Sequence, residues 1–506
     1  LFERQTIARL AQAIEGGAVT PSADITPTAP FELIDASIRA QLPAQVEDAY
    51  PATQMQLAML YHSTVSDDRI LYQDVLCYSL ALPFDAAKLQ RALHDLVARH
   101  DILRTSFDLG SYAQPLQLVH NVASAKLILR TGTTTRETFS EWFEREQREP
   151  IDWSAAPLMR VTAHPLEQDS FILAITFHHA ILDGWSEASL IRELIETYSA
   201  RLRNESVAKP PLNVSFRDFV RLELEAIASE KSDLFWKERT NAPAATVMDP
   251  VSEHKESGNR EVARLALDAK TSDSLSRLSG MLGISLKSLL LAVHAKVLST
   301  VSGSSDVVSG VTLNGRPETQ GSQEILGLFI NTVPMQLSLG TESWAAFAQQ
   351  VFDFERSSLP HRRLPLQVMT RRHGRRVPFE VIFNYTHFHV SEGVYERAGG
   401  PVRTRGGYAA TDVAWTMEFM VPPGESRVEG YLVFDTGRIS GARVAQIVDI
   451  YHSAIALLLA NPDRPHNAVP LIAPNLSRRP VKALARARTR ANAGKTESDR
   501  RLNHAT

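Results

Sequence analysis

Hydrophobic and polar residues alternate along the chain with two different periods. Residues 72–82 (YQDVLCYSLAL) and 157–180 have the apolar and β-branched content of strands, whereas residues 86–100 (AAKLQRALHDLVARH) place apolar side chains at helical spacing. The second half repeats this order, with two helices predicted in residues 271–303 and a strongly alternating strand in residues 379–390. We therefore predict an α/β fold. Because 506 residues exceed what one hydrophobic core usually holds, we expect two similar lobes.

The two ends of the chain differ from this pattern. Residues 1–17 have helical spacing and end in two glycines, whereas residues 18–44 are rich in Pro, Thr and Ser, the composition of an interdomain linker. Residues 476–506 repeat arginine among alanines with few large apolar side chains, as expected of a basic linker or tail. The folded body is thus predicted as a first lobe at 45–220 and a second lobe at 221–475.

Composition argues against several classes of protein. The net charge is −3 and the sequence pI is about 6.6, so nothing global indicates binding to nucleic acid or to an anionic membrane. We find no stretch of about 20 apolar residues and no basic-then-apolar leader, so we expect neither a membrane segment nor secretion. The single cysteine, Cys77, lies in a predicted strand without a disulfide partner. This favours a reducing, cytoplasmic setting and a buried thiol rather than a nucleophile.

The candidate chemistry lies at a strand end in FILAITFHHAILDGWS, residues 171–186. His178, His179, Asp183 and Gly184 follow a run of β-type residues, so their side chains can reach a cavity from a fixed backbone. Imidazole is the base best matched to neutral pH, and Gly184 would allow a close backbone approach. Adjacent histidines on a strand point to opposite faces, so we predict that this pair does not share a metal ion.

This HHxxxDG pattern resembles the hallmark of the condensation domains of non-ribosomal peptide synthetases. Six further segments resemble that family's motifs, in the family's order. They are YPATQMQLAMLYHS (50–63), RHDILRTSF (99–107), VSFRDFVRLE (214–223), EILGLFINTVPMQL (324–337), HRRLPLQVM (361–369) and FEVIFNYT (379–386). The resemblance therefore extends from about residue 45 to about residue 475.

The resemblance implies a V-shaped pseudo-dimer of two chloramphenicol-acetyltransferase-like lobes, with the histidine motif at their junction. It also implies peptide bond formation, in which the amine of an acceptor aminoacyl thioester attacks a donor aminoacyl or peptidyl thioester. Both substrates would arrive on 4'-phosphopantetheine arms of carrier domains, so no cofactor is expected in this domain. The donor carrier would lie upstream in the same polypeptide, with residues 1–17 resembling its last helix. An acceptor carrier and an adenylation domain would follow downstream.

The same resemblance suggests roles for the motif residues. His179 matches the second histidine, which would accept a hydrogen bond from the attacking amine and either remove its proton or position it. His178 is expected to be structural. Asp183 either orients His179, as in a catalytic triad, or forms a buried ion pair with an arginine, for which Arg104 is the candidate.

Further positions have two interpretations each. Trp185 forms either the floor of a cavity or part of the core. Asn331 matches an asparagine of the family's fifth motif and either buttresses the channel from the second lobe or forms a turn. His387 and His389 share a β face with Tyr385, which lines the acceptor side or is simply an exposed sheet face.

Three other functions compete with amide formation. Epimerisation domains share HHxxxDG, but they typically insert a small residue and Ser before the Trp, whereas Trp185 follows Gly184 directly. A stand-alone acyltransferase is disfavoured by the carrier-like helix and linker. A non-catalytic recruitment domain of the same fold usually has a degraded motif, and heterocyclisation domains replace the histidines by aspartates.

The sequence leaves the substrates open. Neither the donor and acceptor amino acids, nor the L or D configuration of the donor, nor the oligomeric state follows from these motifs. Residues 386–390, THFHV, bear a faint resemblance to siderophore synthetases that does not decide the product.

Overall fold

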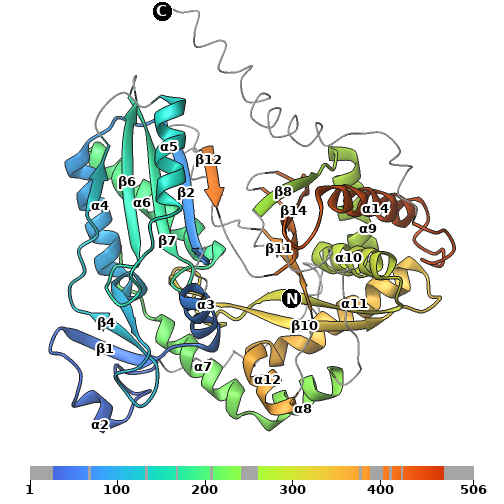
Figure 1. Cartoon of the computed structure of the whole chain (residues 1–506), viewed down its shortest axis with the longest axis horizontal. Helices are drawn as coiled ribbons and strands as arrows, with labels where there is room; N and C mark the ends of the chain where they lie inside the picture. Colours follow the sequence, from blue (N-terminus) through green and yellow to red (C-terminus); the bar gives the residue numbers. More distant parts are fainter. Residues whose placement is uncertain are drawn as a thin grey trace, which may run out of the picture.

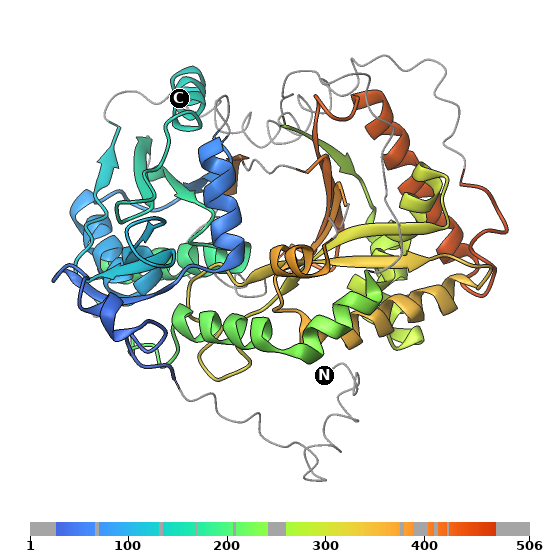
Figure 2. The same ribbon diagram turned by 60° about the horizontal axis from the view of Figure 1, so that its bottom comes forward.

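The computed structural model places most of the chain in two lobes (Figures 1 and 2). The described residues are 27–65, 70–130, 135–166, 169–205, 209–240, 260–374, 379–387, 403–408, 413–422 and 425–471. Figure 2 shows the lobes joined along the bottom and diverging toward the top, in the outline of a V. The α/β class and the two-lobed architecture are therefore confirmed. The predicted helix at 1–17 and the basic tail at 476–506 lie outside the described residues.

The first lobe is built on a five-stranded sheet with the order β12-β2-β7-β6-β5. Its central strand, β7 (Ser170–His178), is buried along nearly its whole length because helices cover both faces. Helices α4 (Ala86–Arg99) and α6 (Gly184–Leu202) share one hydrophobic cluster with it, and α5 (Arg136–Glu146) packs on the opposite face. Cys77 is buried on the α5 face, as its alternating strand predicted.

The other elements of this lobe include a small three-stranded sheet, β1-β4-β3, at its base. They are α2 (Ala36–Arg39), β1 (Val46–Pro51), α3 (Gln54–Val65), β2 (Gln73–Leu80), η1 (Asp101–Arg104), β3 (Thr105–Asp108), β4 (Leu116–His120), β5 (Leu127–Leu129) and β6 (Met159–Leu166).

The second lobe has a six-stranded sheet with the order β10-β9-β11-β13-β14-β8. The leucine-rich helix α10 (Leu286–Ser302) is buried on nearly all sides because it contacts α9, α11, α14 and the sheet. The remaining elements are α8 (Glu230–Arg239), β8 (Arg260–Leu265), α9 (Ala269–Leu282), β9 (Asp306–Asn314), β10 (Ile330–Ser338), α11 (Trp344–Ser358), η2 (Leu359–His361), α12 (Leu366–His373), β11 (Val381–Thr386), β13 (Trp415–Met420), β14 (Glu429–Asp435) and α14 (Gly441–Ala460).

Three segments connect the lobes. Helix α7 (Phe216–Ala228) runs along the bottom of the molecule, so a boundary at residue 220 falls inside it (Figure 2). Residues 325–329 come from the second half of the sequence but supply Leu326 and Phe329 to the first-lobe core. Strand β12 (Arg403–Tyr408) pairs antiparallel with β2 at the edge of the first-lobe sheet. The two halves of the sequence are thus interlocked at the junction of the lobes.

Helix α14 corrects one expectation from the sequence. By length and composition it is apolar enough to cross a membrane, although we expected no such segment. One set of its apolar side chains, including Ile447, Tyr451 and Leu458, is buried in the second-lobe core. A core helix of a folded domain meets the same compositional criterion, and no membrane role follows from it.

A buried carboxylate in α7 makes stability depend on pH. Glu223 accepts a hydrogen bond from the backbone N–H of Gln54, 2.9 Å away at the start of α3. Burial raises the pKa of Glu223 to about 8, against a smaller lowering by that hydrogen bond. The unfolded chain releases this proton near a pH of about 4.3, the ordinary value for a glutamate. The folded state therefore binds more protons between these two values, and stability falls as the pH rises through this window.

We predict that Glu223→Gln removes much of this loss while keeping the acceptor for Gln54. At pH 8 the variant should gain about 2 kcal/mol in free energy of unfolding, since one pKa unit corresponds to about 1.4 kcal/mol and neighbours relax around the charge. Urea unfolding at several pH values measures this. Glu225→Gln, on the same helix with a side chain 55% exposed, is the matched control and should leave the pH dependence unchanged. Equal pH slopes for Glu223→Gln and the parent protein would contradict the prediction.

Candidate active site

The two motif histidines point to opposite faces of the end of β7, as predicted. His178 is buried, and its Nδ1 accepts the backbone N–H of Ala180 at 3.1 Å. Its Nε2 lies 3.1 Å from the hydroxyl of Ser63 on α3. Burial, followed by the neighbouring His179, lowers the pKa of His178 to about 3, so the ring is neutral at physiological pH. With Nδ1 as acceptor, Nε2 carries the hydrogen and donates to Ser63.

His179 is held by its backbone and by Nδ1. Its N–H donates to the carbonyl of Tyr72 at 2.7 Å, and Nδ1 lies 2.5 Å from the carbonyl of Leu182. The same Nδ1 lies 3.6 Å from Oδ2 of Asp74. Because a carbonyl and a carboxylate both face Nδ1, this nitrogen carries a hydrogen, and in the tautomer with its hydrogen on Nδ1 the other nitrogen, Nε2, is an acceptor. The side chain keeps 22% of its surface exposed, so it remains partly accessible.

Tyr72 shows local backbone strain beside this histidine. Its φ is +58°, a left-handed conformation that costs a bulky residue about 1–2 kcal/mol. The strained residue immediately precedes β2, and its carbonyl is the group that anchors the His179 N–H. Strain of this kind concentrates at functional sites because the surrounding structure must hold it in place.

Asp183 does not orient His179 in this structure. It caps the N-terminus of α6, where Oδ1 accepts the N–H of Ser186 at 2.8 Å. Its Oδ2 accepts the N–H of Phe329 at 3.0 Å, and Oδ1 lies 3.6 Å from Arg316 Nη2. The carboxylate therefore joins the first lobe to the segment that enters from the second half of the sequence.

The predicted ion pair is present, but with a different arginine. Arg104 is wrong as the partner, because it lies at the base of the first lobe and pairs with Glu47 and Asp101. Its guanidinium also donates to the carbonyl of His120 at 2.5 Å. Arg104 thus fastens η1 to β1 and β4, away from the histidine motif.

Arg316 and Ser186 complete the network around Asp183. The Arg316 guanidinium donates to the hydroxyl of Ser186 at 2.9 Å and to the carbonyl of Ser322 at 2.8 Å, and it stacks 3.9 Å from the Phe329 ring centre. The Ser186 hydroxyl in turn contacts both backbone groups of Gly327. A Cβ at Gly327 would lie only 2.2 Å from the Phe216 ring, so this close approach requires glycine.

The other predicted positions lie around this junction. Gly184 is the first residue of α6, and the half-buried Trp185 donates from Nε1 to the carbonyl of Gln323 at 3.2 Å, so it bridges the two halves rather than filling a core. Asn331 is buried in strand β10, which excludes the turn interpretation. Its Nδ2 donates to two carbonyls, those of Arg362 and Leu364, at 2.8 and 2.9 Å.

The predicted β face around Tyr385 is described only in part. Tyr385 is half-buried on β11, and burial raises its pKa to about 12. His387 is exposed, and His389 lies outside the described residues. Whether this face lines an acceptor channel stays a prediction. Among the residues that the structure describes, no group of three or more His, Cys, Asp or Glu side chains is placed to hold a metal ion.

Comparison with known proteins identifies the family. The family model described as Condensation domain matches residues 46–475. The chain belongs to the condensation domain family. A curated relative of this condensation domain, the AMB antimetabolite synthetase AmbE of Pseudomonas aeruginosa, is 35% identical over 509 residues. That match covers 96% of this chain but only 23% of AmbE.

More distant relatives and solved structures agree. Surfactin synthase subunit 3 of Bacillus subtilis is 21% identical, with 85% of this chain and 34% of that protein covered. The X-domain from teicoplanin biosynthesis superposes with a TM-score of 0.72 at 20% identity, over 85% of this chain and 98% of that one. The first condensation domain of the calcium-dependent antibiotic synthetase gives 0.68 at 18%, over 84% and 99%. These structural matches confirm the predicted pseudo-dimeric fold.

Sequence analysis of the condensation domain missed three carboxylates, of which Asp74 and Glu187 lie near His179 and Glu418 lies near Asp74. Asp74 lies on β2, Glu187 on α6 and Glu418 on β13 of the second lobe. Burial raises the pKa of Glu187 to about 7, with the Tyr78 hydroxyl and His179 lowering it and Asp74 raising it further. Burial and then Asp74 also raise the pKa of Glu418, so the electrostatic coupling spans the lobe junction.

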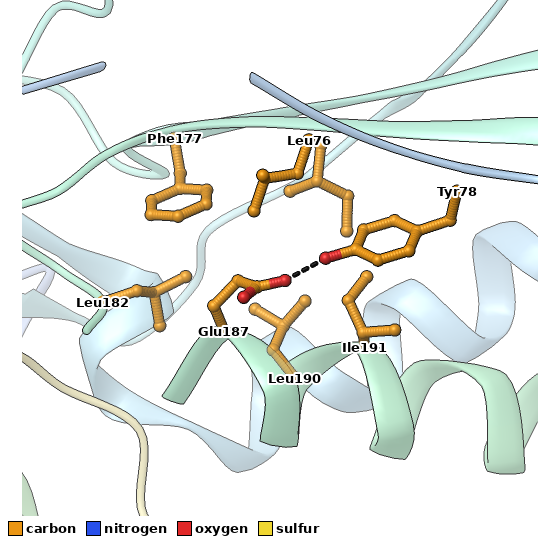
Figure 3. A pocket seen from close by; sticks show the side chains of 8 residues that line it. Leu76, Tyr78, Phe177, Leu182, Glu187, Leu190 and Ile191 are labelled. Carbon is orange, nitrogen blue, oxygen red and sulfur yellow. Dashed lines mark hydrogen bonds between the residues drawn. The ribbon is translucent and has the colours of Figure 1, made fainter. Parts of the chain in front are cut away.

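Figure 3 shows where Glu187 points. Its carboxylate reaches between the sheet and α6 and meets the hydroxyl of Tyr78 in an apolar pocket. The pocket is lined by Leu76, Tyr78, Ile175, Phe177, Leu182, Glu187, Leu190 and Ile191. The hydrophobic pattern of the sequence contains a signal for Asp74 and Glu187. Asp74 interrupts an apolar strand, and Glu187 occupies the helical position that continues the apolar stripe of Leu190, Ile191 and Leu194.

Proposed function

We propose that this condensation domain forms amide bonds between two carrier-bound substrates. The observation that carries the proposal is the state of His179, whose Nδ1–H is occupied by the Leu182 carbonyl while Nε2 is left as an acceptor. An imidazole fixed in this tautomer can accept a hydrogen bond from an attacking amine. The intact network around Asp183, which joins the two halves of the sequence at this histidine, supports a working rather than a degraded motif.

In the proposed reaction the acceptor amine attacks the donor thioester carbonyl. The new C–N bond forms, the C–S bond breaks, and one amine proton passes through His179 Nε2 to the departing thiolate. General base catalysis of this type contributes about 10²–10⁴-fold. Alignment of two bound reactants contributes effective molarities of about 10⁵–10⁸ M. His179 therefore acts as a positioning group as much as a base.

The same proposal names the partners. A donor carrier precedes this domain in its polypeptide, and an acceptor carrier and an adenylation domain follow it, with phosphopantetheine arms delivering the thioesters. The multidomain relatives support this arrangement, because the chain spans only 23% and 34% of the two described above. The single cysteine of the sequence, Cys77, is buried, which is compatible with a reducing, cytoplasmic setting.

A direct assay tests the reaction. The protein is mixed with one aminoacyl thioester on a donor carrier and another on an acceptor carrier, and mass spectrometry follows dipeptidyl product on the acceptor. Amide product supports the proposal. Inversion at the α-carbon of a single loaded carrier, without amide, would instead establish epimerisation. Carrier binding with neither reaction would point to a recruitment domain, a function also compatible with this fold.

A further inference from the structure

Within the part of the chain that the structure describes, the carboxylate paired with His179 comes from outside the HHxxxDG motif. Asp74 Oδ2 lies 3.6 Å from Nδ1 of His179, whereas Asp183 is engaged by Ser186, Phe329 and Arg316. In the antiparallel pairing of β2 with β7, Asp74 faces Phe177 directly. Because alternate residues of a strand share a face, Asp74 and His179 are diagonal neighbours on the α6 side of the sheet.

We propose that Asp74 is a positioning residue that acts through His179: the Leu182 carbonyl holds Nδ1–H, and the Asp74 carboxylate on β2 stabilises the imidazolium that forms when Nε2 takes the amine proton. The inference rests on the proposed amide-forming function and adds to it a partner that the motif does not contain. The proton balance is unchanged: the proton moves from the amine to Nε2 and then to the thiolate, while Nδ1 keeps its own hydrogen throughout. Asp74 itself does not become protonated.

The burial of Asp74 supports a functional role over a stabilising one. Only 8% of its surface is exposed, and its Oδ1 is buried without a hydrogen-bond partner among the described residues. An unsatisfied carboxylate oxygen costs free energy of folding, so the fold retains this group at an energetic loss. Burial raises the pKa of Asp74, and the attraction of His179 opposes that rise. Burial thus favours the neutral carboxylic acid, and a positive charge on His179 favours the carboxylate.

Two further carboxyl groups lie near Asp74. Glu187 on α6 and Glu418 on β13 add carboxyl groups from two further elements, and both are electrostatically coupled to Asp74. His178, on the opposite face of β7, is neutral because its pKa is depressed to about 3. Glu187 accepts a hydrogen bond from the Tyr78 hydroxyl, whereas Asp74 lies within 4 Å of His179 Nδ1. Asp74 therefore exerts the most direct effect on the ring.

The test is Asp74→Asn, which keeps the shape and an acceptor oxygen but removes the charge. We expect kcat for amide formation to fall about 10–100-fold with little change in KM. This loss is smaller than the full contribution of a general base, because His179 itself is still present. The acidic limb of the pH–rate profile should move down by about one to two pH units, because an opposite charge at this distance favours the charged imidazole by that amount. The free energy of unfolding should stay equal or rise. A merely structural carboxylate would produce a loss of stability and no movement of the profile.

Controls separate this inference from the function beneath it. Asp95→Asn, on the exposed surface of α4, should leave both kcat and the profile unchanged. Asp74→Glu keeps the carboxylate on a longer side chain. The acidic limb of its pH–rate profile should lie between that of the parent protein and that of Asp74→Asn. NMR titration of selectively labelled histidines gives an independent readout: the His179 midpoint should fall in Asp74→Asn even in the absence of substrates. An unchanged His179 midpoint together with an unchanged kcat in Asp74→Asn would overturn the inference. If the parent protein forms no amide but the His179 midpoint still moves in Asp74→Asn, only the proposed function is refuted.

Discussion

Replacing His179 by alanine is expected to lower kcat for amide formation about 10²–10⁴-fold. The ring presents Nε2 as an acceptor because its Nδ1–H is held by the Leu182 carbonyl, and alanine removes that acceptor without touching the carbonyl. Some product should remain, because the two carrier-bound substrates would still be aligned by the rest of the domain. Single-turnover formation of dipeptidyl carrier, followed by mass spectrometry, measures the effect.

Two comparisons make this result interpretable. His94→Ala, on the exposed face of α4, is the matched control and should retain full activity. Because His179 is only partly buried and lies at a strand end, His179→Ala should remain folded, which circular dichroism checks. A folded His179→Ala protein with a parent-like rate would show that amide formation does not depend on this imidazole. Alignment of the two bound substrates would then account for catalysis without a general base.

The histidine end of the site could be predicted from the sequence for simple geometric reasons. Two histidines in succession at the end of an extended strand point to opposite faces. The nine-residue strand β7 ends at His178, and the structure places His178 toward Ser63 and the following His179 toward Asp74. The assignment of His178 as a hydrogen-bonded group also agrees with its contacts. These features depend on local periodicity, which a single segment contains in full.

The partners of the motif could not be predicted in the same way. Arg104 is the arginine that the motif RHDILRTSF offers as a partner of Asp183. The arginine that lies beside Asp183 is Arg316, on a segment that crosses from the second half of the sequence. Asp74 became a neighbour of His179 only through the register of β2 on β7, in which Asp74 faces Phe177. Register and crossing connections are set by the assembled core, not by any one segment.

The network around Asp183 gives the largest expected effect on stability. Asp183 and Arg316 are both almost fully buried, at 3% and 6% exposure, and they hold residues 316–329 against the start of α6. We expect Asp183→Ala to lower the free energy of unfolding by about 3–5 kcal/mol, because it leaves a buried guanidinium without its counter-charge and removes the cap of α6. Arg316→Met should cost a similar amount by stranding the carboxylate. Urea unfolding followed by tryptophan fluorescence measures both.

The double variant distinguishes an ion pair from two independent sites. If Asp183 and Arg316 are coupled, Asp183→Ala with Arg316→Met should cost clearly less than the sum of the single changes, since the second substitution removes the stranded charge. The exposed pair of Asp95 and Arg201 between α4 and α6 is the control, and Asp95→Ala should cost no more than about 1 kcal/mol.

The activity of Asp183→Asn separates the ion-pair role of Asp183 from a role in a catalytic triad. Asp183 contacts the backbone of Phe329 rather than the imidazole of His179. Folded Asp183→Asn should therefore keep kcat within about tenfold of the parent value. If Asp183 were instead the carboxylate of a catalytic triad, kcat would fall about 10⁴-fold.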